Sequence, residues 1–190
     1  AVDYRGADVR LSLDLAYQRA KVAHLRPMVQ LAAGVTEIPD APDAGANYGQ
    51  DWNFTTLRDL FGIAKAEYDV TDGVMVYAAV GARDTAERGR YQSFTVDDAA
   101  TGAAFATGST IPRNDNNEAG QAGIRAKFAT GPITHEINIG GSHSRYVNRN
   151  AFAFGAFGRS ATNGTNLYDP VAVAQPAFNG FANGNLDDPT

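Results

Sequence analysis

The chain has 190 residues, of which 44% are hydrophobic, a net charge of −5 and no cysteine. This length and composition fit one folded domain of roughly 150 to 200 residues. The chain contains no run of Lys and Arg that would neutralise successive phosphates, which argues against nucleic-acid binding, and the lack of cysteine excludes disulfides and thiolate metal sites. No apolar run reaches the ~20 residues of a membrane-spanning helix, so if this chain crosses a bilayer it does so as strands.

Residues 9–18 read VRLSLDLAYQ, and every second residue of this stretch is apolar. A period of two is that of a β-strand. Two interpretations are open. In one, a soluble antiparallel sheet buries the apolar face in its core. In the other, a transmembrane barrel strand turns its apolar face to lipid while Arg10, Asp14 and Gln18 face a hydrated lumen.

Four further strands are expected, arranged as two hairpins. These strands cover residues 60–70, 74–83, 122–129 and 135–146. Thr71-Asp72-Gly73 joins the first pair and Thr130-Gly131-Pro132 the second, both with glycine in a tight turn. Residues 57–68 also carry apolar residues at helical spacing, so only their place in a hairpin favours a strand.

Three long stretches lack strand signals and are rich in Gly, Pro and Asn: residues 19–57, 85–118 and 147–190. Long and short connections therefore alternate. Outer-membrane barrels pair short periplasmic turns with long extracellular loops, whereas soluble sandwiches keep both ends short. The pattern predicts an all-β fold, an antiparallel segment of a transmembrane β-barrel with about five strands. The smallest barrels have eight strands, so this chain could not close one alone.

Several motifs follow one another in a characteristic order: LAYQR, RPMVQL, a loop leading to W-x-F, RDLFGIAKAEYDVTDGVMVYAAVGARD and NLYDPV. Over nearly the whole chain they resemble the barrel of TonB-dependent ferric-siderophore receptors. The resemblance implies a bacterial outer-membrane barrel of 22 strands, filled by an N-terminal plug, that imports iron chelates with energy from TonB. Residues 1–190 are then expected to be part of one barrel domain, without the plug, its TonB box or the strands that close the barrel.

The sequence offers no arrangement for catalysis or for a resident metal. DNNEAG (115–120) lacks the ligands of a calcium loop, and GAAFATGST (102–110) lacks the lysine of a phosphate loop. We therefore expect a receptor that is not an enzyme and binds no cofactor directly, with iron arriving only as a siderophore chelate. The partners that the resemblance implies are a ferric siderophore, the TonB system through the plug, and outer-membrane lipid, in a monomeric parent protein.

A ligand site is expected where aromatic and cationic side chains gather on the long loops, because ferric siderophores are bulky and often anionic. Five residues meet this description: Arg26, Tyr48, Trp52, Tyr91 and Phe94. The alternative for each of these five residues is packing within the loops. For three further aromatic residues, Tyr17, Tyr77 and Tyr146, the alternative is anchoring at the membrane interface. Charged side chains of both signs occupy the positions that are expected to face the lumen. They either keep the barrel wall hydrated or contact a ligand or the plug. These positions are Arg10, Asp14, Lys65, Glu67, Arg125 and Lys127.

Two other functions stay open at this point. One is a barrel that recognises a surface or adheres to it without transport, and the other is a soluble ligand-binding β-domain. A plug domain with a TonB box would separate a transporter from both.

Overall fold

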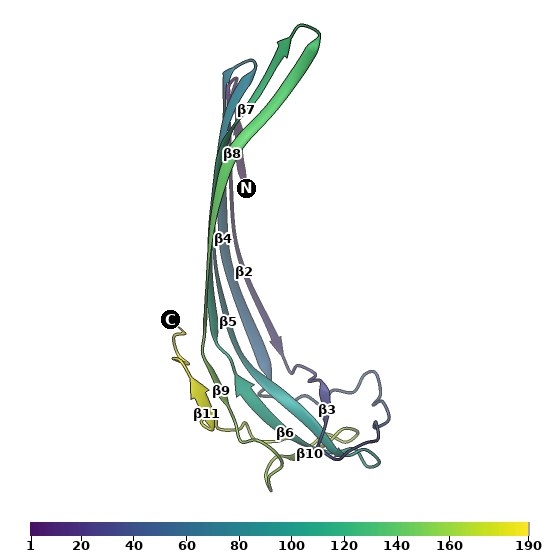
Figure 1. Ribbon diagram of the computed structural model, residues 1–190. Coiled ribbons are helices and arrows are strands. Elements are labelled where there is room, and N and C mark those ends of the chain that lie inside the picture. Colours follow the sequence, from purple (N-terminus) through teal and green to yellow (C-terminus); the bar gives the residue numbers. More distant parts are fainter. Residues whose placement is uncertain (190) are drawn as a thin grey trace. The chain divides into compact units, whose positions relative to one another are not determined.

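The computed structural model describes residues 1–189, which form strands, turns and loops (Figure 1). The strands are β1 (Val2–Arg5), β2 (Val9–Ala23), β3 (Val29–Leu31), β4 (Phe54–Thr71), β5 (Val74–Asp98), β6 (Ala103–Thr110), β7 (Arg113–Thr130), β8 (Ile133–Asn150), β9 (Phe152–Phe154), β10 (Gly164–Asn166) and β11 (Phe181–Asn183). Within the described residues, no helix is long and apolar enough to span a membrane. The predicted all-β class is confirmed.

The strands join in one sheet whose order is β1-β2-β4-β5-β6-β9-β11. In addition, β3 and β7 pair with β5, β8 pairs with β7, and β10 pairs with β6. Neighbouring strands in the sheet pair antiparallel in β1 and β2, where Val2 lies opposite Leu13, in β5 and β6, and in β6 and β9. One parallel contact interrupts this rule, because β3 returns to β5 with Val29 opposite Phe94.

Both predicted hairpin turns are confirmed. Asp72 and Gly73 connect β4 to β5, and Gly131 and Pro132 connect β7 to β8. Gly131 has a φ of 60°, a left-handed conformation in which a side chain would be strained. Residues 57–68, which also fit a helix by spacing, lie within β4 and are extended.

The predicted loop at residues 85–118 is wrong. β5 continues to Asp98, β6 covers Ala103–Thr110, and β7 begins at Arg113. The distal part of β5 has charged residues at adjacent positions, Glu87 and Arg88, so its sequence loses the apolar alternation that identifies a strand. Similarly, β2 extends to Ala23 and β4 begins at Phe54, both inside the predicted loop 19–57.

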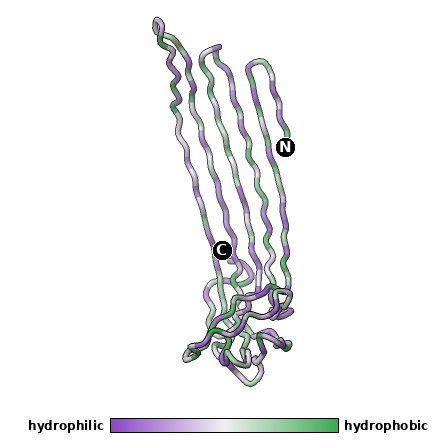
Figure 2. The backbone as a smooth tube through the Cα atoms, turned by 90° about the vertical axis from the view of Figure 1, so that its right-hand side faces the viewer, coloured by the Kyte–Doolittle hydropathy of each residue, from purple (hydrophilic) through white to green (hydrophobic). Residues whose placement is uncertain are grey.

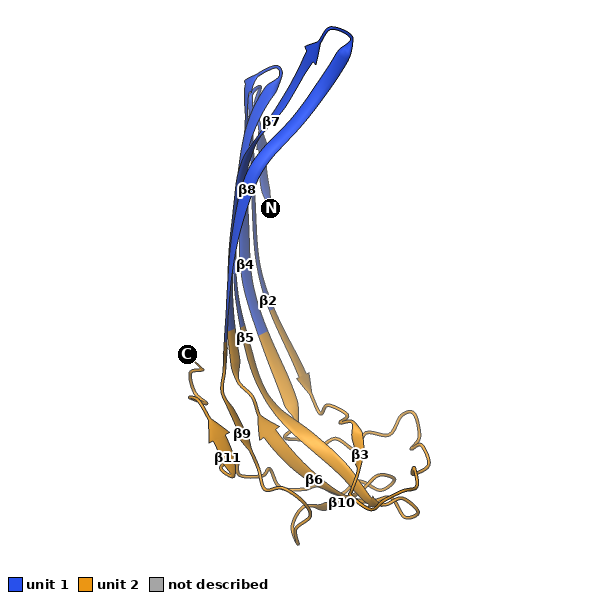
Figure 3. Ribbon diagram, viewed as in Figure 1, with its two compact units in different colours: residues 1–18, 58–85, 115–148 blue, residues 19–57, 86–114, 149–190 orange. Residues whose placement is uncertain are grey.

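The chain divides into two compact units (Figure 3). Unit 1 consists of residues 1–18, 58–85 and 115–148, and unit 2 of residues 19–57, 86–114 and 149–190, of which residue 190 lies outside the described chain.

Unit 1 contains strand segments whose two faces differ in chemistry. Figure 2 shows hydrophobic and hydrophilic residues alternating along the strands. On one face the large apolar side chains are exposed, and they include Leu11, Leu13, Leu15, Tyr17, Leu60, Tyr68, Val70, Val80, Ile124, Phe128, Ile137 and Ile139. None of the residues of unit 1 is buried. Such a sheet has no core of its own and needs a solvent that suits each face.

The other face of unit 1 carries ion pairs. Arg10 Nε donates to Glu67 Oε2 at 2.8 Å, and its two terminal nitrogens donate to both carboxylate oxygens of Asp69 at 2.7 Å. Lys127 pairs with Glu136 at 2.8 Å. Charges that neutralise one another across strands suit a hydrated wall, as the sequence predicted for this face.

Unit 2 has a small apolar core. It consists of Tyr48, Phe94, Val96, Ala104 and Leu167, with Val29 packed against it. The core lies on one face of β5 and β6, where the register places Phe94 opposite Ala106 and Val96 opposite Ala104. The loop before β4 and the segment after β10 cover this face.

Candidate ligand-binding site

Arg26, Tyr48 and Phe94 form a stack in unit 2. The rings of Tyr48 and Phe94 lie 4.9 Å apart, tilted by 52°. The guanidinium of Arg26 lies 6.0 Å from the Tyr48 ring, and its Nη2 donates to the carbonyl of Ala44 at 2.9 Å. Tyr48 is 7% exposed and Phe94 is fully buried, so Arg26 is the member of the stack that meets solvent.

Gln50 connects two loops that are distant in sequence. Its side-chain amide donates to the carbonyl of Val171 at 3.0 Å, and its side-chain oxygen accepts from the amide of Val173 at 2.6 Å. The backbone amide of Gln50 donates to the side chain of Gln92 on β5 at 2.6 Å. Both glutamines are buried, and an unpaired amide there would lose its hydrogen bonds to water without replacement. The two loops are therefore fixed to β5 and to each other.

Trp52 completes this connection. Its indole Nε1 donates to the carbonyl of Val173 at 3.0 Å. The ring lies against Gly108 of β6, where an added Cβ would stand 2.9 Å from the indole. Glycine at 108 is thus required by the close approach of the ring.

A cavity of about 250 Å³ opens beside Trp52. It is lined by His24, Asn47, Gly49, Gln50, Asp51, Trp52 and Pro170 to Val173. His24 Nε2 donates to the carbonyl of Gly49 at 2.6 Å and lies 3.6 Å from a carboxylate oxygen of Asp51. Pockets for small molecules usually measure ≈300–1,000 Å³, so this cavity suits one arm of a bulky ligand rather than the whole.

Tyr91 lies apart from the stack. It is three residues from Phe94 on β5, so the two side chains leave opposite faces of the strand. The Tyr91 hydroxyl donates to Glu87 and lies 3.1 Å from Thr55 Oγ1, and Glu87 in turn pairs with Arg113 at 3.0 Å. Partial burial, and then the hydrogen bond to Glu87, raises the pKa of the Tyr91 phenol above its usual range.

The five predicted site residues therefore do not form one cluster. Arg26, Tyr48 and Phe94 lie together, Trp52 adjoins them through the loop that carries Val173, and Tyr91 belongs to the opposite face of β5. A ligand on one face of this strand reaches Tyr91 or the stack, but not both.

Four phenylalanines form an aromatic cluster that the sequence analysis did not identify as a site. They are Phe152 and Phe154 on β9, Phe157 and Phe181, and neighbouring rings lie 5.5 to 6.3 Å apart. Phe157 is 74% exposed and Phe181 54%. The spacing of the phenylalanines in FAFGAFG (residues 152–158) could have revealed this cluster, because it is typical of a short strand followed by glycine. The sequence analysis instead assigned these residues to a loop.

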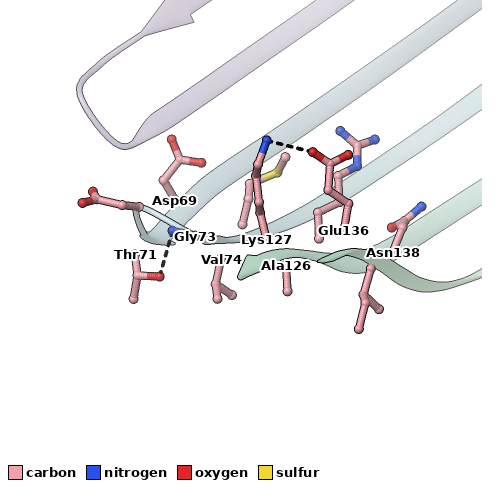
Figure 4. A pocket seen from close by; sticks show the side chains of 12 residues that line it. Asp69, Thr71, Gly73, Val74, Ala126, Lys127, Glu136 and Asn138 are labelled. Atoms are coloured by element: carbon pink, nitrogen blue, oxygen red, sulfur yellow. Dashed lines mark hydrogen bonds and ion pairs between the residues drawn. The ribbon is translucent and has the colours of Figure 1, made fainter. Parts of the chain in front are cut away.

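A second cavity, of about 480 Å³, lies in unit 1 at the turn between β4 and β5 (Figure 4). Asp69, Thr71, Gly73, Lys127 and Glu136 lie around it, with the Lys127–Glu136 ion pair at its edge. Residues 1–189 contain no group of three side chains that could hold a metal ion. With its charges paired at a hairpin end, this cavity resembles a hydrated wall rather than a binding site.

Comparison with known proteins places the chain in one group. No family model matches it. The chain is 36% identical over 175 residues to the ferrichrome receptor FcuA of Yersinia enterocolitica, a match that covers 92% of this chain and 22% of the relative. The chain thus spans about a fifth of the length of this curated relative.

Two solved structures share the fold. One is BauA, the ferric preacinetobactin receptor of Acinetobacter baumannii, with a TM-score of 0.75 at 23% identity, over 93% of this chain and 26% of that one. The other is the siderophore receptor PiuA of the same organism, with a TM-score of 0.70 at 16% identity, over 88% of this chain and 27% of that one.

All three proteins are receptors rather than enzymes. The two structural matches confirm that the antiparallel sheet corresponds to part of a receptor barrel, and the sequence match extends over almost the whole chain. The chain is therefore homologous, over most of its length, to a barrel segment of the TonB-dependent ferric siderophore receptors, a family of the bacterial outer membrane.

Proposed function

We propose that these residues form part of one β-barrel domain whose parent protein imports ferric siderophores, with energy transmitted from TonB through a plug domain. The observation that carries the proposal is the 36% identity over 175 residues to a ferrichrome receptor. The two-faced strands of unit 1, apolar on one side and charged on the other, suit a barrel wall between lipid and a hydrated lumen.

Within this function, the proposed ligand residues divide into two roles. Trp52 and Arg26 are the side chains that meet a ligand on the Phe94 face of β5, and Tyr91 is the one that meets a ligand on the opposite face, since each retains exposed surface. An aromatic ring offers stacking area at low entropic cost, and a guanidinium attracts an anionic chelate. Tyr48 and Phe94 act from the core, since Tyr48 contacts Arg26 and lies in the same loop as Trp52.

Transport can be tested directly in cells that lack their own siderophore receptors. The parent protein is produced there, and accumulation of radioactive iron from a panel of ferric siderophores is measured with and without a functional TonB system. We expect at least one chelate to accumulate, and only when TonB is functional. Surface binding without accumulation in either strain would indicate a non-transporting recognition barrel, and an absence of both binding and accumulation would contradict the proposal.

A further inference from the structure

The cavity beside Trp52 is lined by a residue with an unusual backbone conformation. His24 has a φ of 56°, and among residues 1–189 it is the only residue other than glycine with a positive φ. Its amide donates to the carbonyl of Asn53 at 2.8 Å, and its carbonyl accepts from the side chain of Asn47 at 2.8 Å. A strained backbone persists only where its surroundings fix it, and such positions cluster at active sites and ligand clamps. This cavity is therefore a candidate for ligand recognition.

Most polar side chains of the cavity, all of which belong to unit 2, already have partners. The side-chain amides of Asn47 and Gln50 and the indole NH of Trp52 are bound to backbone groups of the two loops. The imidazole of His24 donates its Nε2 proton to the carbonyl of Gly49 at 2.6 Å. A ligand could use these groups only by breaking hydrogen bonds that hold the loops together.

Asp51 is the exception among these side chains. Its carboxylate side chain is 93% exposed, and His24 Nε2 lies 3.6 Å from one of its oxygens, which is beyond hydrogen-bond distance. Across residues 1–189, no donor lies within hydrogen-bond distance of this carboxylate. Neither Lys nor Arg is among the described residues that line the cavity, so with a neutral imidazole the cavity carries one negative charge.

Trp52 adds an aromatic surface next to that charge. It follows Asp51 directly in sequence, and both residues line the same cavity. The face of an indole attracts a cation, more strongly than the rings of Tyr or Phe do, and a carboxylate attracts the same cation and repels an anion. The pair of Asp51 and Trp52 therefore favours an ammonium group over a neutral or anionic one.

We propose that this cavity binds a protonated amine on one arm of the ferric chelate and that Asp51 determines this preference. The inference rests on the proposed import of ferric siderophores and narrows it to chelates that carry a basic arm. The ammonium donates to the Asp51 carboxylate and lies against the indole of Trp52. Arg26 is not among the lining residues, so an anionic iron centre and a cationic arm do not compete for one place.

The test is isothermal titration calorimetry of the purified full-length parent receptor in detergent with two probes. Both are the same ferric trihydroxamate chelate, one with a free primary amine on a side arm and one with that amine acetylated. The unsubstituted receptor should bind the free-amine form at least about fivefold more tightly. Asp51→Asn keeps the shape of the side chain and removes its charge, so it should abolish the difference by weakening only the free-amine form.

Asp43→Asn is the matched control, because Asp43 is an exposed carboxylate of the same loop that does not line the cavity, and it should keep the preference. Equal affinity of the unsubstituted receptor for the two forms, or a preference that persists in Asp51→Asn, would overturn the inference. So would binding of neither form by a receptor that takes up iron from another chelate. A lack of iron uptake from every chelate would instead contradict the proposed import itself.

Discussion

The two units differ in where their side chains find a suitable environment. In unit 1 no residue is buried, one face is apolar and exposed, and the other carries ion pairs. Within residues 1–189, all the buried residues belong to unit 2, which holds a core around Phe94 and a network of buried amides at Gln50 and Gln92. Unit 1 thus depends on lipid and water for its stability, whereas unit 2 is stabilised by its own packing.

The largest effect is expected in unit 2. Phe94→Ala removes a fully buried ring and should destabilise the loop assembly by about 3–5 kcal/mol. Limited proteolysis of the parent receptor in membranes should then cut the loop before β4 much faster, while the heat-resistant migration of the folded barrel on gels is kept. Loss of the folded barrel itself would show that the two units are not stabilised separately.

A smaller effect is expected on the apolar face of unit 1. Leu13→Arg should impair assembly by about 2–4 kcal/mol if this side chain lies near the bilayer midplane, since a charge there meets hydrocarbon. Asp14→Asn, the adjacent position on the hydrated face, is the control and should be mild. Equilibrium unfolding of the parent receptor in lipid vesicles measures both. If the two variants had equal effects, Leu13 would not face lipid.

Trp52→Ala should lower siderophore affinity by more than about 1 kcal/mol, because the indole is both a stacking surface beside the cavity and the link to Val173. Trp52→Phe keeps a ring but removes the hydrogen bond, so it separates these two contributions. Binding of iron-loaded siderophore to whole cells gives the affinity, with receptor abundance measured separately. Unchanged binding in Trp52→Ala would assign the residue to loop packing alone.

The smallest effect concerns the turn between β5 and β6. Asp98 Oδ1 accepts from the amides of Ala100 at 3.0 Å and Thr101 at 3.3 Å. Hydrogen bonds, chiefly from the Thr101 side chain and amide, lower the pKa of the Asp98 carboxyl below its ordinary 3.8. The carboxylate therefore stabilises the turn above this ordinary pKa, and that contribution is lost as the pH falls through the lower pKa of the folded state.

Hydrogen exchange at the Ala100 and Thr101 amides measures this dependence. Protection of these amides, corrected for intrinsic exchange rates, should fall on acidification below about pH 4. Asp98→Asn should remove the change. A pH dependence that persists in Asp98→Asn would assign it to another group.

The sequence predicted the strands of unit 1 more accurately than those of unit 2. Residues 9–18 and the two hairpins were identified because lipid requires an apolar side chain at every second position. The distal part of β5 was missed because Glu87 and Arg88 put charges on both faces, which removes that period. β6 was missed because its sequence, AAFATGST, consists mostly of small residues and lacks large apolar side chains at alternate positions.

The ligand residues were harder to predict for a different reason. An aromatic residue in a long loop has the same sequence signature whether it contacts a ligand or fills a core. Only the register of β5 against β6, which places Phe94 opposite Ala106 under the loops, reveals that Phe94 is buried. Side-chain alternation places Tyr91 and Phe94 on opposite faces only if both lie in a strand, and the sequence did not predict that β5 extends to these residues.

The central claim is that the strands of unit 1 cross the outer membrane, with the turn at Asp72 inside and the loop before β4 outside. Residues 1–190 contain no cysteine, so single cysteines can be introduced there as Asp72→Cys and Asp43→Cys in the parent receptor, with the unsubstituted receptor as background. A membrane-impermeant maleimide should label Asp43→Cys on intact cells and Asp72→Cys only after the outer membrane is permeabilised. Labelling of Asp72→Cys on intact cells would contradict the account.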